Sequence, residues 1–360
     1  MQGEVEWWEV QPQERTWTGL PHGSGSDGLG AQRLSLEQLH DWEALGYGMF
    51  LHFGMSTFEG RERSLGDRPS LDYHPDSLNV NQWISVAADA GMRYAVLTVK
   101  HGSGHCLWPS DFTDYNVTTS GNSTDVVDKF VSACQQYKLM AGIYYCSVDT
   151  HNSFGSLGPE TALGSIRPFS TARYRAFQAN QIEELLSRYG PIGEVYIDVP
   201  GMLGPDGRNE QYAQISELSP NSVVLMNSGY GDGNTIDTNF AWPTDALVME
   251  RTLPSSRNGY RAWHTLDLNG AGAQRYYVPG EVSETIGQEW FHVPGDMPRS
   301  PSELLGMRLV TCARGSNLLL NVPPDRHGVI PRESVDALQR LARDYERAEK
   351  PGAAMLEDKV

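Results

Sequence analysis

The sequence predicts an α/β protein that forms a (β/α)₈ barrel of the TIM type. Short, continuously apolar runs alternate with amphipathic helical patterns along the chain, which is typical of parallel strands buried on both faces. Eight such runs over about 300 residues fit a closed barrel better than an open sheet. No complete glycine-rich phosphate loop with a Walker lysine follows any run, and this disfavours a nucleotide-binding open sheet.

The order of elements follows from these runs. We expect strands at residues 48–53, 94–99, 140–145, 194–198, 223–226, 246–249, 276–278 and 318–322. Helical patterns lie between most of them, at residues 81–90, 124–137, 171–189, 210–218, 302–312 and 334–348. We therefore divide the chain into an irregular Trp- and Gly-rich arm (residues 1–42), the barrel (43–350) and a short tail (351–360).

Composition narrows the class of function. The 28 Lys and Arg against 45 Asp and Glu give a net charge of −17, which disfavours binding to nucleic acid or to an anionic membrane surface. No apolar run is long enough to predict a transmembrane helix, and the first residues lack a basic region followed by an apolar one. We therefore expect a cytoplasmic protein. Four cysteines without a C-x-x-C pair predict neither a disulfide framework nor a cysteine zinc site.

Most of the predicted strands end in polar residues. In barrels of this type, the active site lies at the carboxyl-terminal ends of the strands, and we call this edge the rim. Asp198 and Glu250 each close an apolar run, two strands apart. A carboxylate at such a position requires partners, so it is either structural or functional. Two carboxylates facing each other across a barrel mouth suit the cleavage of a glycosidic bond. The alternative is a pair of rim salt bridges to lysine or arginine.

Three histidines permit a second hypothesis. His52 lies near the end of the first predicted strand, and His101 and His105 follow the second. Imidazoles on adjacent strands can ligate zinc, with Asp198 as a further ligand. The first strand lacks an H-x-H pattern, and a flexible Gly-Ser-Gly separates His101 from His105. We therefore expect no metal and no organic cofactor, and a metal-dependent barrel hydrolase remains an alternative.

Several motifs, taken together, resemble the α-L-fucosidases of glycoside hydrolase family 29 over residues 43–345. They are GMFLHFG at 48–54, ADAGMRYAVLTVKH at 88–101, CLWPS with TDYN at 106–116, GIYY at 142–145, YGPI with VYID at 189–198 and NLLLNVPP at 317–324. The resemblance implies a retaining exo-glycosidase that acts on a fucosylated oligosaccharide or glycoconjugate through a covalent intermediate, without a cofactor.

The resemblance also implies roles for single residues. Asp198 matches the nucleophile, and Glu250 is our choice for the acid/base, with Asp237, Asp245 and Glu281 as rivals. Residues that match or resemble sugar-contacting positions are His52, Glu62, His101, Tyr145 and Trp290. His105, which replaces a family phenylalanine, is a further candidate for binding the substrate. Each has a simpler alternative: packing for His52, Tyr145 and Trp290, or a solvated loop charge for Glu62.

Four departures from the family pattern bear on the substrate. Gly102 replaces the second of two adjacent histidines, Arg63 replaces a tryptophan, and Val199 replaces the glycine after the nucleophile. The sequence also ends soon after the eighth strand, without the C-terminal β-sandwich that is common in the family. A glycosidase for another sugar or polysaccharide and a non-catalytic sugar-binding barrel therefore remain alternatives, and the sequence leaves a homo-oligomer open.

Overall fold

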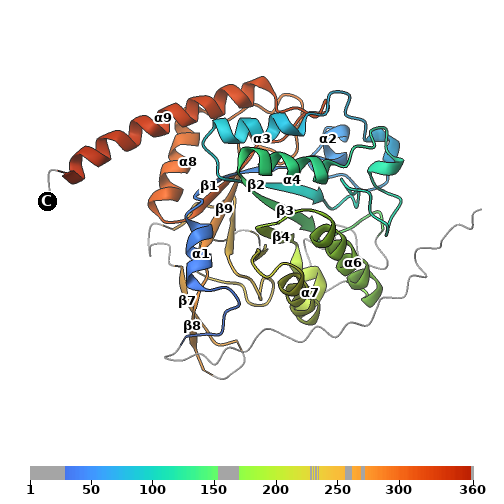
Figure 1. The fold of residues 1–360 in the computed structure, drawn as a ribbon, viewed down its shortest axis with the longest axis horizontal. Coiled ribbons are helices and arrows are strands. Elements are labelled where there is room, and N and C mark those ends of the chain that lie inside the picture. Colours follow the sequence, from blue (N-terminus) through green and yellow to red (C-terminus); the bar gives the residue numbers. More distant parts are fainter. Residues whose placement is uncertain are drawn as a thin grey trace, which may run out of the picture.

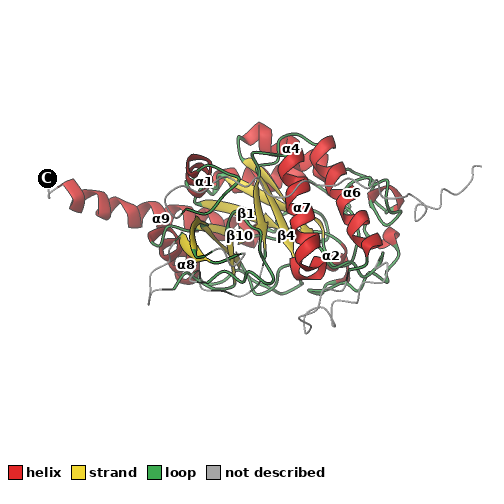
Figure 2. Ribbon diagram, turned by 90° about the horizontal axis from the view of Figure 1, so that it is seen from below, coloured by secondary structure: helices red, strands yellow, loops and turns green. Residues whose placement is uncertain are grey.

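A barrel of parallel strands forms the centre of the molecule (Figures 1 and 2). The computed structural model describes residues 29–152 and 170–357, except 228, 230, 232, 234, 256–261 and 269–271. Its main sheet has eight strands in the order β5-β4-β3-β2-β1-β10-β9-β6. A parallel bridge between Leu225 and Ala246 joins the two edge strands. The sheet thus closes on itself, as the sequence predicts.

The barrel strands are β1 (Tyr47–Leu51), β2 (Tyr94–Lys100), β3 (Met140–Cys146), β4 (Glu194–Asp198), β5 (Val223–Met226), β6 (Leu247–Glu250), β9 (Gly280–Thr285) and β10 (Asn317–Asn321). The helices are α1 (Leu36–Glu43), α2 (Met55–Glu59), α3 (Val80–Asp89), α4 (Val126–Tyr137), α6 (Ala172–Arg188), α7 (Gly204–Leu218), α8 (Pro301–Ala313) and α9 (Arg332–Glu357). Figure 2 shows the helices enclosing the strands. None of the described helices combines the length and apolar character that crossing a membrane requires.

The prediction for the seventh strand was wrong. Residues 276–278 belong largely to β8 (Gln274–Tyr277), which pairs antiparallel with β7 (Trp263–Leu266) in a separate two-stranded sheet. The seventh barrel strand is β9, whose sequence Gly-Glu-Val-Ser-Glu-Thr is fully buried although mostly polar. Hydrophobicity does not identify such a strand because most of its residues are polar. One of them, Glu281, accepts a hydrogen bond from the Tyr94 hydroxyl.

Side-chain alternation along the strands divides the core into two layers. On β3, Ile143 and Tyr145 pack outward in the layer shared with the helices, whereas Tyr144 and Cys146 point into the barrel. Phe50, Tyr196 and Leu319 fill the same interior from other strands. This alternation decides which strand residues can reach the barrel mouth.

Local sequence signals set the helix starts. Side chains of Ser35, Asn79, Asp125, Thr171 and Ser300 accept hydrogen bonds from backbone N–H groups in the first turns of α1, α3, α4, α6 and α8. The capping box of Ser35 and Gln38 places a helix within the segment predicted to be irregular. Residues 1–28 of that segment lie outside the described residues. At the other end, α9 packs against α8 and extends to Glu357, into the predicted tail (Figure 1).

Candidate active site

Asp198 and Glu250 end β4 and β6, and the amide of Asn227 lies between them. Asn227 Nδ2, directly after β5, donates to Asp198 Oδ1 over 2.7 Å and to Glu250 Oε2 over 2.9 Å. The two carboxylate oxygens are therefore separated by at most the sum of these two distances. This limit is compatible with the spacing of about 5–5.5 Å between the carboxyl groups of retaining glycosidases. The structure thus brings together the pair that the sequence predicted.

The surroundings of Glu250 favour its protonated form. Burial raises the pKa of the Glu250 carboxyl, and the negative charge of Asp198 raises it further. The hydrogen bond from Asn227 and the charges of Arg251 and Arg63 act in the opposite direction but do not reverse the shift. A carboxyl group with a raised pKa beside a second carboxylate is suited to act as a general acid.

The backbone turns in the same way after each of the two carboxylates. Val199 and Arg251 both have a φ of 49°, in the left-handed region that β-branched residues such as valine rarely adopt. Val199 therefore takes up the conformation for which glycine is suited, although its side chain makes this conformation costly. Although valine replaces the family's glycine here, Asp198 still ends β4 and is followed by a residue in the left-handed conformation.

Tyr144, and not Tyr145, contacts Asp198. The Tyr144 hydroxyl donates to Asp198 Oδ2 over 2.6 Å. Tyr145 lies on the other face of β3, where its hydroxyl donates to Gln181 Oε1 over 2.7 Å in the layer beneath α6. Because successive strand residues point to opposite faces, the two positions cannot both face the barrel mouth. The structure therefore does not bring Tyr145 to the carboxylate pair.

His52 and His101 lie side by side above the barrel interior, with ring centroids 5.9 Å apart. His52 Nδ1 contacts Asn321 Oδ1 at 2.8 Å, and the His101 ring stacks on Tyr144 at 5.7 Å. Burial lowers the pKa of His52 well below its ordinary value, and it lowers that of His101 to about 4 against the opposing charge of Asp198. Both imidazoles are therefore neutral at neutral pH. Because Asn321 Oδ1 accepts from His52 Nδ1, Nε2 of His52 is left to accept a hydrogen bond from a hydroxyl group. A neutral His101 has one ring nitrogen that donates and one that accepts.

Glu62 anchors an aromatic wall beside these histidines. Its Oε2 accepts the backbone N–H of Trp290 over 2.9 Å and that of Phe291 over 3.4 Å. The Trp290 ring lies 5.1 Å from the His52 ring, and the Phe291 ring lies 4.9 Å from the His101 ring. Burial, reinforced by Glu289, raises the pKa of Glu62 to about 7. Glu62 and Trp290 thus lie together beside His52.

His105 occupies a different environment. Its Nε2 contacts Ser120 Oγ at 2.8 Å, and its ring packs against Tyr73 and Tyr115 at centroid distances of 4.9 and 5.1 Å. Burial lowers its pKa to about 3. The structure therefore does not place His105 with His52 and His101. Within the described part of the chain, no group of three or more His, Cys, Asp or Glu side chains is arranged to hold a metal ion.

The rival carboxylates serve other contacts. Asp245 is buried before β6, where it pairs with Arg33 and accepts the Tyr212 hydroxyl. Glu281 lies near the start of β9 and accepts the Tyr94 hydroxyl. Asp237 is exposed and accepts the backbone N–H of Asn239. Glu250, in contrast to these three rivals, shares a hydrogen-bond donor with Asp198.

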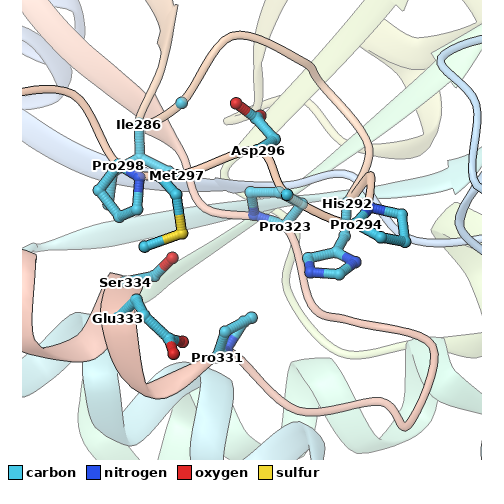
Figure 3. Close-up of a pocket in the computed structure, with 12 residues that line it drawn as sticks. Ile286, His292, Pro294, Asp296, Met297, Pro298, Pro323, Pro331, Glu333 and Ser334 are labelled. Atoms are coloured by element: carbon cyan, nitrogen blue, oxygen red, sulfur yellow. The ribbon is translucent and has the colours of Figure 1, made fainter.

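A cavity of about 220 Å³ lies next to the loop that carries Trp290, but it contains none of the predicted site residues. Its lining includes His292, Asp296 and Met297 from that loop and Glu333 from the start of α9. Figure 3 shows His292 and Met297 on opposite sides of it. The Asp296 carboxylate already accepts the backbone N–H groups of Gln288 and Glu289. Neither Asp198 nor Glu250 lines this cavity.

Sequence reasoning did not assign roles to Tyr144, Asn227 and Asn321. Asn227 and Asn321 each end an apolar run, so their position at the rim was a usable signal. For Tyr144, the signal was the alternation of side chains on β3. Cys146 pairs with Asp198 across β3 and β4, so the two side chains point to the same face. Tyr144 lies two residues before Cys146 and therefore also faces the barrel interior.

Comparisons with known proteins indicate one family. The family model for α-L-fucosidase matches residues 69–346. α-L-Fucosidase 1 of Arabidopsis thaliana is 30% identical over 326 residues, which cover 86% of this chain and 59% of that protein. Tissue α-L-fucosidase of Mus musculus is 27% identical over 271 residues, covering 72% and 52%. The chain thus spans less than two thirds of the length of these relatives.

A solved structure shows the same fold. α-L-Fucosidase isoenzyme 1 from Paenibacillus thiaminolyticus superposes with a TM-score of 0.69 at 25% identity, covering 86% of this chain and 75% of that one. The barrel, the carboxylates that end β4 and β6, and the family model that matches most of the sequence lead to one conclusion. The chain belongs to the α-L-fucosidase family, glycoside hydrolase family 29.

Proposed function

We propose that this chain is a retaining exo-α-L-fucosidase that acts on fucosylated oligosaccharides or glycoconjugates. The observation that carries the proposal is the hydrogen bonding of Asn227 Nδ2 to both Asp198 and Glu250. A carboxylate pair at this separation can form a covalent glycosyl-enzyme, whereas the inverting mechanism requires room for a water molecule between the two groups.

In the first step, an Asp198 oxygen attacks the anomeric carbon and the bond to the leaving oxygen breaks. Glu250 donates its proton to that oxygen, so the aglycone departs as a neutral alcohol. In the second step, water loses a proton to the Glu250 carboxylate and attacks the anomeric carbon. The bond to Asp198 then breaks, releasing the sugar and restoring both side chains.

The surrounding residues position these groups. Tyr144 donates to Oδ2 of Asp198 and Asn227 donates to Oδ1, and together these two hydrogen bonds fix the orientation of the carboxylate. Neutral His52 and His101 are placed to hydrogen-bond sugar hydroxyls, and the Trp290 ring offers an apolar surface for the methyl group of fucose. Glu62 keeps Trp290 in place through the backbone.

The departure at Gly102 leaves the sugar hydroxyls with one histidine fewer than the family pattern provides. His105 does not replace it in this structure, because its ring packs against Tyr73 and Tyr115. We expect the enzyme to accept fucose with weaker binding, since a lost hydroxyl contact costs about 1–3 kcal/mol.

The test is hydrolysis of an aryl α-L-fucoside beside a panel of other aryl glycosides, with and without a chelator. We expect release from the fucoside alone, insensitive to the chelator, and a loss of several orders of magnitude in Asp198→Asn with the fold intact. Activity abolished by a chelator and restored by zinc would favour a metal-dependent hydrolase. Binding of fucose without turnover of any substrate would favour a sugar-binding barrel.

A further inference from the structure

Arg251 connects the strand end that carries Glu250 to the loop that carries Trp290. It follows Glu250 directly, and its backbone N–H donates to the Ser283 carbonyl on β9 over 2.9 Å. Its guanidinium lies over the Trp290 ring, 4.9 Å from the ring centre, and Nη2 donates to the Gln288 carbonyl over 2.8 Å. One side chain thus contacts both the aromatic ring and the backbone of the same loop.

The backbone of Arg251 is held in an uncommon conformation. Its φ of 49° lies in the left-handed region, where a residue with a side chain is less stable than glycine. Such conformations persist where the surrounding contacts hold the residue in place, and they are frequent at functional sites. The Ser283 carbonyl, the Gln288 carbonyl and the Trp290 ring are the contacts that hold Arg251. The arginine at this position therefore calls for a role that its side chain serves.

Trp290 is half-buried, and different residues hold its backbone and its ring. Glu62 accepts the backbone N–H of Trp290 and does not touch the ring through that bond. The ring lies 5.1 Å from the His52 ring and 6.1 Å from the Phe50 ring, both at the end of β1. Arg251 adds the contact from β6. A planar guanidinium can stack on an aromatic face and donate hydrogen bonds at the same time, which a lysine ammonium cannot do.

We infer that Arg251 is a positioning residue that holds the Trp290 ring in place for the methyl group of fucose, and that it thereby helps to select fucose over a sugar with a hydroxyl group on the same carbon. This inference rests on the proposed function and deepens it. A hydroxyl group placed against an apolar ring loses water without gaining a partner, whereas a methyl group gains contact. Arg251 acts through Trp290 and takes no part in the proton transfers.

The experiment compares two substrates with the same activated phenol, the α-L-fucoside and the α-L-galactoside. The galactoside differs from the fucoside only by a hydroxyl group on carbon 6. The measured quantity is the ratio of kcat/KM for the fucoside to that for the galactoside, in the wild type, Arg251→Met, Arg251→Lys, Trp290→Ala and the double variant Arg251→Met/Trp290→Ala. Any effect of the lost charge on the neighbouring Glu250 is common to both substrates and cancels in this ratio.

Arg275→Met is the matched control. The Arg275 guanidinium lies 4.6 Å from the centre of the Trp263 ring in the separate sheet of β7 and β8. The variant therefore removes the same charge and the same kind of stacking contact, away from the carboxylate pair. Its ratio should equal that of the wild type.

We expect the ratio to fall about fivefold in Arg251→Met, which loses the ring contact and the hydrogen bond to Gln288, and about twofold in Arg251→Lys. On the fucoside, the loss should appear mainly in KM, because the methyl contact is made in the ground state and the transition state alike. Trp290→Ala should lower the ratio at least as far. Adding Arg251→Met to Trp290→Ala should then change nothing further, because the arginine acts through the ring.

Three outcomes overturn the inference and leave the proposed function standing, provided that the wild type hydrolyses the fucoside. They are a wild-type ratio of one, a wild-type ratio retained in Arg251→Met, and a further fall when Arg251→Met is added to Trp290→Ala. If Arg251→Met does not fold, a wild-type ratio in Arg251→Lys rejects the inference instead. No hydrolysis of either substrate by the wild type rejects the proposed function and this inference together.

Discussion

The Tyr144 hydroxyl donates a hydrogen bond of 2.6 Å to Oδ2 of Asp198. The next residue along β3, Tyr145, donates to Gln181 on α6, away from the barrel mouth. Two adjacent tyrosines thus hold comparable hydrogen bonds on opposite faces of one strand, and only one of these bonds ends on a carboxylate of the proposed reaction. The pair provides a matched test of the site.

Tyr144→Phe should lower kcat for an aryl α-L-fucoside about 10- to 100-fold. A hydrogen bond to a charged group contributes about 1.5–3 kcal/mol, and its loss leaves Asp198 less well positioned and stabilised. Tyr145→Phe should instead lower the free energy of unfolding by about 1–2 kcal/mol, because Gln181 Oε1 loses a buried donor. Steady-state kinetics and urea unfolding of both variants measure the two effects. Equal losses of kcat would contradict this assignment.

Removing the proposed acid should lower activity by an amount that depends on the leaving group of the substrate. Glu250→Ala should reduce hydrolysis of a natural fucosylated oligosaccharide far more than that of an activated aryl fucoside, whose leaving oxygen needs no proton. Added azide should restore turnover of the aryl fucoside and yield the fucosyl azide of retained configuration. Equal reduction on both substrates, without rescue by azide, would assign the acid to a different residue.

The raised pKa of Glu250 predicts the pH range over which activity declines on the alkaline side of the profile of kcat/KM against pH. Glu250 must be protonated to act as an acid, so activity on a substrate with a poor leaving group should fall as pH rises through its pKa. Because burial and Asp198 raise that pKa above 4.5, the decline begins at a higher pH than for an ordinary glutamate. In Glu250→Gln, the residual hydrolysis of an activated aryl fucoside should lose this decline. A profile of kcat/KM against pH measures it, and an unchanged alkaline side in the variant would refute the assignment.

A second pair of glutamates should make stability depend on pH. Glu194 and Glu281 are fully buried inside the barrel, where Trp42 Nε1 donates to the first and the Tyr94 hydroxyl to the second. Burial raises the pKa of Glu194 to about 8 and that of Glu281 well above its ordinary value, to which the charge of Glu194 contributes. The folded state therefore binds these protons more tightly than the unfolded state does. The resulting stability is present below about pH 4.5 and is lost as pH rises through the folded-state pKa values.

Glu194→Gln should flatten this dependence between about pH 5 and pH 8, because the amide keeps an acceptor for Trp42 without an ionisable proton. The exposed Glu217→Gln on α7 is the control, and its curve should follow the wild type. Urea unfolding at a series of pH values gives both curves. Parallel curves for the wild type and Glu194→Gln would show that the pair does not titrate on unfolding.

Much of the molecule could be predicted from the sequence because its signals are local. Continuous apolar runs predicted seven of the eight barrel strands, and the residues that end β1, β2, β4 and β6 predicted His52, His101, Asp198 and Glu250 at the rim. A barrel places every strand end at one face, so position in the sequence sufficed to collect these side chains. The strand β9 was missed because most of its residues are polar, and one of them, Glu281, is bonded by Tyr94, which lies far away in the chain.

The tertiary structure decided the contacts that depend on the orientation of side chains and on distant partners. The sequence by itself determined the barrel, the family resemblance and the two carboxylates. It did not determine that Tyr144 and not Tyr145 meets Asp198, that Asn227 joins the two carboxylates, or that His105 packs against Tyr73. These relationships depend on which face of a strand points inward and on the register of neighbouring strands, and a shift by one residue exchanges the two faces.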